Sequence, residues 1–176
     1  MVEITVISTV IAATSVVIGV IYYIISLRYQ KRVRNTDLIL RLYSTFGSEE
    51  FQKAALKVGR LDYRDYDDFI NKYGPITSSE EPVQMAFTKV MFFYEGVGIL
   101  LQRKLIDIDL VAQLFGPTIK WQWEKIRPLI ESLRKQLNAP NMSKSFENLY
   151  YEMMKREEKL QQSMRQAQPQ GVEMPA

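Results

Sequence analysis

The 176-residue chain has no cysteine and no histidine. These absences exclude disulfides, thiolate nucleophiles and the zinc sites that are built from Cys and His. They also exclude Ser–His and Cys–His nucleophile pairs and the commonest general base near neutral pH. Any catalysis would have to depend on carboxylates, lysine or tyrosine. From the sequence alone we assign no catalytic residue, no cofactor-binding residue and no metal ligand.

Charge is absent from most of the N-terminal region. Residues 4–27 carry no charged side chain, whereas Glu3 and Arg28 stand on either side of them. At about 1.5 Å per residue, a helix of this length could cross a hydrocarbon core of about 30 Å. A cleaved signal peptide fits poorly, because the segment starts beside an acid and no A-x-A site follows it. The pattern predicts a single transmembrane helix.

A basic cluster, formed by Arg28, Lys31, Arg32 and Arg34, follows this segment. Cations at one end of a membrane span favour the cytoplasmic side. We therefore expect a single-pass protein of the cell membrane, with its N-terminus outside and the rest cytoplasmic. Residues 36–176 hold 19 basic and 19 acidic groups, so the net charge of +3 belongs to residues 1–35. This distribution favours membrane lipid, and not nucleic acid, as the partner of the cations.

Small residues form one stripe along the same segment. Ser8, Ala12, Ser15 and Gly19 recur at spacings of three or four residues. In lipid, small residues allow two helices to approach closely, so the stripe predicts a homo-oligomer through this helix. The alternative is that the hydroxyl groups bond back to their own helix.

The remainder of the chain has the periodicity of helices and no convincing strand pattern. We expect an all-α protein with three parts: an anchor with its basic flank at 1–35, a cytoplasmic helical bundle at 36–165 and a disordered tail at 166–176. The expected helices are the anchor helix continued to Gly47, a short helix capped by Ser48, another within 62–74, a long helix over about 80–103, a short helix from Asp107 to Gly116, a long helix kinked at Pro128, and a last helix opened by Ser143 or Ser145.

The segment YEGVGILL at 94–101 contains two glycines beside a glutamate in an apolar run. A phosphate-binding G-x-G-x-x-G loop needs a third glycine, where this chain has Leu101, and a strand before it. The glycines are better explained by close helix packing or by local loosening of the helix. Glu95 lies among apolar residues, so we expect a buried structural carboxylate paired with Arg127 or Arg134. A catalytic or ligand-binding acid is the alternative.

Two further groups have simple structural interpretations. Four acids crowd the segment 62–68, namely Asp62, Asp65, Asp67 and Asp68. They lack the glycine and the final glutamate of a calcium-binding EF-hand loop, and acids at the start of a helix favour its dipole. Trp121 and Trp123 project from different sides of one helix, so one is expected in the core and the other at the surface.

The run from Phe93-Tyr94-Glu95 through the turn at 105–110, Phe115-Gly116 and the Trp121–Arg134 helix resembles a family of uncharacterised prokaryotic proteins known as a domain of unknown function. The segment FENLY at 146–150 resembles the family's closing aromatic-Glu segment. The resemblance implies a membrane-anchored helical plan and brings no activity, substrate or catalytic residue.

Two classes of function follow from these observations. The first is a membrane-tethered interaction or regulatory protein, not an enzyme, that binds a protein partner through its helical bundle. The second is a carboxylate-dependent enzyme acting on a lipid or phosphate substrate at the membrane surface. The missing histidine, cysteine and phosphate loop favour the first class.

Overall fold

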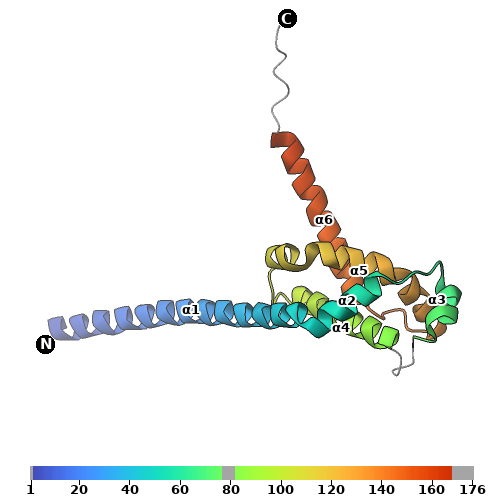
Figure 1. Ribbon diagram of the computed structural model, residues 1–176. Helices are drawn as coiled ribbons and strands as arrows, with labels where there is room; N and C mark the ends of the chain where they lie inside the picture. Colours follow the sequence, from blue (N-terminus) through green and yellow to red (C-terminus); the bar gives the residue numbers. More distant parts are fainter. Residues whose placement is uncertain (1, 77–81, 168–176) are drawn as a thin grey trace, which may run out of the picture. The chain divides into compact units, whose positions relative to one another are not determined.

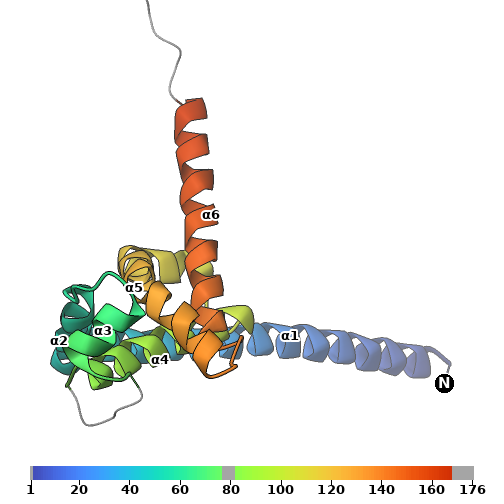
Figure 2. The same ribbon diagram turned by 90° about the vertical axis from the view of Figure 1, so that its right-hand side faces the viewer.

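The computed structural model describes residues 2–76 and 82–167, and the side chains of 14–30, 33–76 and 82–166 among them. In these residues the protein is all-helical, as predicted, with six helices and no strand (Figures 1 and 2). The helices are α1 (Val2–Gly47), α2 (Glu49–Gly59), α3 (Tyr66–Tyr73), α4 (Pro82–Gln102), α5 (Ile108–Gln136) and α6 (Lys144–Ala167).

The predicted membrane localisation is wrong. Within the described part of the chain, no helix combines the length and the apolar character that a membrane crossing requires. The uncharged segment 4–27 has described side chains only from Thr14 onward. Over 14–27, at about 1.5 Å per residue, a helix covers about 21 Å, which is shorter than a hydrocarbon core of about 30 Å. The single-pass topology, with the N-terminus outside and a cytoplasmic bundle, is therefore withdrawn.

The chain divides into two compact units, Met1–Arg41 and Leu42–Ala176. The division lies inside α1, six residues after the boundary expected at 35/36. As predicted, α1 continues without interruption to Gly47. The expected disordered tail at 166–176 falls almost entirely outside the described residues, since α6 ends at Ala167.

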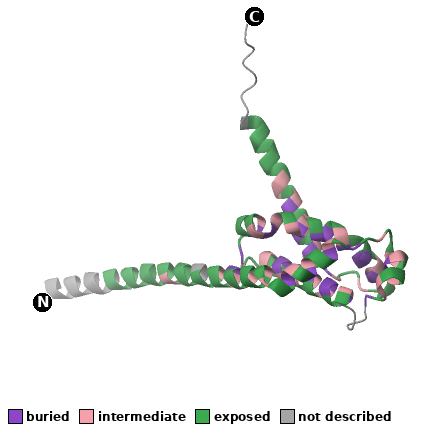
Figure 3. Cartoon of the chain, viewed as in Figure 1, coloured by how far each residue is buried: buried purple, intermediate pink, exposed green. Residues whose placement is uncertain are grey.

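The core of the second unit is built from the apolar faces of α2, α4, α5 and α6 (Figure 3). Aromatic rings fill its centre. Tyr94 of α4 stacks on Phe146 of α6 with ring centroids 4.8 Å apart, and Trp123 of α5 meets the same Phe146 edge-on at 5.0 Å. Such pairs contribute about 0.5–1.5 kcal/mol beyond the apolar area that they bury. These contacts hold α6 against α4 and α5.

Polar residues begin three of the helices as the sequence predicts. The Ser48 hydroxyl accepts the Phe51 amide at 3.2 Å, and the Asp65 carboxylate accepts the Asp68 amide at 2.9 Å. Asp107 accepts the amides of Asp109 and Leu110. Each cap satisfies a backbone donor that has no partner within its helix.

One boundary prediction is wrong, because α5 runs through Gly116 and Pro117 without ending. A proline inside a helix removes a hydrogen bond and costs about 3 kcal/mol. Three residues offset this cost: Val111, Phe115 and Ile119 are fully buried at four-residue spacing, so one apolar stripe crosses the proline. Tertiary packing of this stripe outweighs the local preference of the proline.

The second half of α6 extends beyond the rest of the bundle (Figures 1 and 2). Its first half buries Phe146, Leu149 and Met153 in the core. Farther along the helix, Leu160 and Met164 are largely exposed. This change from buried to exposed apolar residues along one helix places a candidate binding surface beside α6.

Candidate functional site

Glu95 is a structural residue that joins α4 to the beginning of α6. Its two carboxylate oxygens accept the backbone amides of Ser145 at 3.1 Å and Phe146 at 2.7 Å. These amides lie in the first turn of α6 and have no acceptor within the helix. A carboxylate there also favours the positive end of the helix dipole. Glu95 therefore caps α6 from a different helix, 50 residues away in the sequence.

The cations proposed as partners of Glu95 are engaged elsewhere, so that pairing is corrected. The Arg127 guanidinium contacts Glu131 at 2.7 Å on the surface of α5. Arg134 donates to Glu147 at 3.0 Å and to the Met142 carbonyl at 2.9 Å. Glu147 is partly buried. Burial raises its pKa, but hydrogen bonds from Lys144 and Arg134 outweigh burial and leave the pKa below its usual value. Side-chain patterns in the sequence do not show which backbone amides lack a partner, so the first turn of α6 could not be predicted as the partner of Glu95.

The glycine pair of YEGVGILL separates into two roles. A Cβ atom on Gly98 would overlap the backbone carbonyl of Ser145, so glycine lets α4 and α6 touch through their backbones. A Cβ atom on Gly96 would meet no described atom within 4 Å. The expected close helix approach is confirmed at Gly98 and does not apply to Gly96.

Ser143 does not act as the expected cap of α6. It has a φ of 53° and precedes the helix, and its buried hydroxyl has no hydrogen-bond partner among the described residues. The capping function belongs to Glu95, which the amides of Ser145 and Phe146 contact directly.

The acids of segment 62–68 support α3. Asp65 caps the helix, and Asp68 accepts the Arg64 amide at 3.0 Å and pairs with Lys72 at 3.0 Å. The backbone hydrogen bond from Arg64 and the bond from Lys72 lower the pKa of Asp68. Across the residues with described side chains, no group of three or more acids is placed to hold a metal ion.

The remaining predicted residues lie on α1. Of the basic cluster, Arg28 and Arg34 are exposed, whereas the side chains of Lys31 and Arg32 are outside the described residues. Of the small-residue stripe, Ser15 and Gly19 are exposed and the side chains of Ser8 and Ala12 are outside the described residues. Self-association through this stripe stays a prediction.

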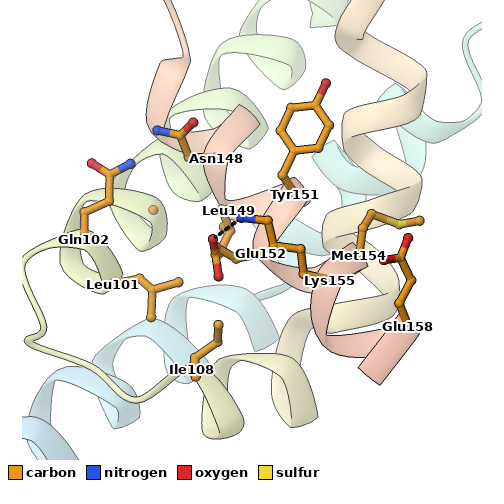
Figure 4. Close-up of a pocket in the computed structure, with 11 residues that line it drawn as sticks. Leu101, Gln102, Ile108, Asn148, Leu149, Tyr151, Glu152, Met154, Lys155 and Glu158 are labelled. Carbon is orange, nitrogen blue, oxygen red and sulfur yellow. Dashed lines mark hydrogen bonds and ion pairs between the residues drawn. The ribbon is translucent and has the colours of Figure 1, made fainter. Parts of the chain in front are cut away.

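A broad groove, here called the α4–α6 groove, lies between the C-terminal end of α4, the start of α5 and one side of α6. It has a volume of about 760 Å³ and is lined by Gly98, Leu101, Gln102, Ile108, Asn148, Leu149, Tyr151, Glu152, Met154, Lys155 and Glu158 (Figure 4). Apolar and polar side chains line it together, and an exposed ion pair between Glu152 and Lys155, 3.1 Å long, lies on its α6 side. The groove is open, and its charged lining residues all lie on α6.

A second groove, here called the Trp121 groove, lies between α5 and the other side of α6. It has a volume of about 450 Å³ and is lined by Ala112, Gly116, Pro117, Lys120, Trp121, Glu124, Met153, Arg156, Glu157 and Leu160. Trp121 is 43% exposed, whereas Trp123 is buried in the core. The prediction that the two tryptophans divide between surface and core is therefore confirmed.

Trp121 owes its position to a glycine on α2. A Cβ atom on Gly59 would overlap the six-membered ring of the Trp121 indole. The ring therefore rests directly on the backbone at the end of α2. This support leaves the rest of the indole open to the groove.

The charged residues of the Trp121 groove already have partners. Lys120 contacts Glu157 at 2.6 Å, and this hydrogen bond raises the pKa of Lys120. Arg156 pairs with Asp109, and Glu124 accepts the Tyr150 hydroxyl at 3.3 Å. The groove thus combines an apolar floor and an exposed indole with walls whose charges are satisfied.

The α6 side of this groove was not predicted from the sequence, because the residues after Lys155 are mostly charged or polar. A signal was present: Met153, Leu160 and Met164 are spaced by seven and four residues, which places them on one helix face. The polar residues between them obscured this sparse pattern.

The folded chain is thus an all-helical protein with an open, apolar surface groove. It belongs to the family described as "Domain of unknown function (DUF4760)", which matches residues 9–153. No curated protein and no solved structure matches the chain. This family match indicates no activity, so the proposed function rests on the geometry of the site.

Proposed function

We propose that this protein is an interaction protein, and not an enzyme, and that its Trp121 groove binds an apolar segment of a partner protein. The main support for this proposal is the half-exposed indole of Trp121, which lies over the Gly59 backbone at the floor of an apolar groove. Tryptophan is enriched among the residues that dominate protein–protein binding energies, because it offers a large and rigid apolar surface.

The composition of the groove supports a protein partner. Apolar side chains form the centre, and paired charges from Lys120, Glu157 and Arg156 form the edge. An apolar centre inside a polar rim is the usual anatomy of a protein interface. Met153 and Leu160 add flexible and branched side chains that can adapt to the shape of a partner.

Three of the carboxylates that the enzyme alternative would use make structural contacts. Glu95 caps α6, Asp65 caps α3 and Asp68 pairs with Lys72. These contacts account for three of the five acids singled out in the sequence without a substrate. The geometry therefore favours binding over catalysis.

The test compares proteins captured by the tagged full-length chain and by two variants. Trp121→Ala removes the indole from the Trp121 groove. Tyr151→Ala is the matched control, because Tyr151 is an aromatic residue with 44% exposure that lines the α4–α6 groove instead. Loss of a central tryptophan contact worth about 2 kcal/mol or more weakens binding by over tenfold.

We expect quantitative mass spectrometry to recover a partner with the wild type and with Tyr151→Ala, and to lose it with Trp121→Ala. Equal thermal midpoints of the two variants would show that the loss does not reflect unfolding. Equal recovery of every partner by Trp121→Ala would contradict the proposed role of the groove.

A further inference from the structure

The segment 14–27 of α1 exposes apolar side chains on every side. Large apolar residues from Val16 to Leu27 are exposed around the helix, with no charged residue among them. A helix that is apolar all round is normally buried, and contiguous exposed apolar surface marks a binding region. This segment therefore needs a surface that accepts uncharged helices.

The Trp121 groove has the electrostatic properties of such a surface. Its four charged lining residues are two cations and two anions, and each already has a partner within the protein. An anionic occupant would lose hydration without finding a cation that lacks an ion-pair partner. A cationic occupant would meet only Glu124, which already accepts the Tyr150 hydroxyl. An uncharged apolar occupant avoids that cost and covers the Trp121 indole.

Resting on the proposed function above, we propose that segment 14–27 of α1 from a second copy of this chain occupies the Trp121 groove. A helix binds a groove through side chains at positions i, i+3, i+4 and i+7. Ile18, Ile21, Tyr22 and Ile25 have this spacing, and all four are exposed. They form one edge of α1 that faces the groove of the other copy.

Every chain carries both the helix and the groove, so the contact joins two different surfaces. Two chains that exchange their α1 segments reciprocally form a closed dimer. Chains that do not exchange them reciprocally form a longer, open assembly. In both arrangements Ile21 of one chain lies beside Leu160 of another. The proximity of Ile21 in one chain to Leu160 in the other is therefore what the experiment measures.

The absence of cysteine makes the chain suitable for site-specific crosslinking. One full-length variant carries Ile21→Cys and a first tag; another carries Leu160→Cys and a second tag. The control is Leu137→Cys, which has the same substitution and an exposure of 51% against 49% at Leu160. Leu137 lies at the end of α5 and does not line the groove.

After mixing and mild oxidation, we expect the disulfide between Ile21→Cys and Leu160→Cys to exceed that between Ile21→Cys and Leu137→Cys about tenfold, the ratio given by a preference of about 1.4 kcal/mol. Disulfides require Cβ atoms about 3.5–4.5 Å apart, so the yield reports proximity. Adding Trp121→Ala to the Leu160→Cys chain should reduce the yield severalfold.

Three outcomes would overturn the inference. Equal yields at Leu160 and Leu137 would mean random collision, and a dominant Ile21–Ile21 disulfide would mean that α1 pairs with α1. Loss of the mixed disulfide on adding phosphatidylcholine vesicles, with the protein floating on them, would identify lipid as the cover. If Trp121-dependent capture of a different protein persists in any of these cases, the inference fails and the proposed function stands. If Trp121→Ala changes neither capture nor crosslinking, both fail.

Discussion

The two sides of α6 meet the bundle in opposite ways. Toward α4, the first turn of α6 is closed: the Gly98 backbone touches Ser145, and Glu95 satisfies the amides of Ser145 and Phe146. Toward α5, the helix leaves the Trp121 groove open, with an exposed indole. The first contact fixes the position of α6, and the second is the proposed binding surface. Substitutions at the closed contact should therefore change stability, while those at the open groove should change binding.

The largest effect is expected at Gly98. Gly98→Ala places a methyl group against the Ser145 backbone, which cannot move without shifting the start of α6. Overpacking of this kind costs about 1–3 kcal/mol. Gly96→Ala is the control, because its Cβ has free space and alanine stabilises a helix by about 0.5–1 kcal/mol relative to glycine.

Urea unfolding should thus move in opposite directions for two neighbouring glycines. A lower free energy of unfolding for Gly98→Ala and a higher one for Gly96→Ala is the expected pair of results. Stabilisation by both substitutions would refute the closed backbone contact between α4 and α6.

Glu95→Ala comes next, because it removes both hydrogen bonds that the carboxylate accepts from the first turn of α6. Replacing a side chain that caps a helix by alanine costs about 0.5–2 kcal/mol. Glu50→Ala is the control; Glu50 pairs with Lys89 at 3.0 Å, but its side chain is 84% exposed, so the cost should stay below about 1 kcal/mol. Urea unfolding measures both free energies.

A second measurement locates the effect of Glu95. Loss of the cap should speed hydrogen exchange of the Ser145 and Phe146 amides more than exchange in the middle of α5. Uniform acceleration throughout the bundle would mean that the carboxylate acts on global stability without capping α6.

Much of the fold could be predicted from the sequence, because its signals are local. Ser48, Asp65 and Asp107 mark helix starts, and apolar periodicity marks the bundle helices. The continuity of α5 through Pro117 could not be predicted in this way, because it depends on burial of Phe115 and Ile119 by other helices. Local preference and tertiary packing conflict there, and packing prevails.

The site was less predictable because its contacts join distant segments. The sequence indicated that Glu95 needs a partner and that one tryptophan lies at the surface. It could not show that the partner is the backbone of α6, or that Trp121 rests on Gly59. Those relations depend on how α2, α4, α5 and α6 pack together. The uncharged N-terminal segment misled the prediction of location because its strong apolar signal was taken as a membrane span.

The smallest effect on stability, and the sharpest test of the open groove, is expected from Gly59→Ala. The added methyl group overlaps the outer ring of Trp121, which is half exposed and can swing toward the groove. Because no backbone has to move, the free energy of unfolding should change by no more than about 0.5 kcal/mol, as at surface sites.

Gly116→Ala is the matched control: Gly116 also lines the groove, but its Cβ would meet no described atom within 4 Å. The Trp121 fluorescence, isolated by subtracting the spectrum of the corresponding Trp121→Phe variant, should become more accessible to acrylamide in Gly59→Ala and stay unchanged in Gly116→Ala. Identical quenching in both would show that the indole does not rest on Gly59, and the binding surface would then lose the rigidity on which its proposed function depends.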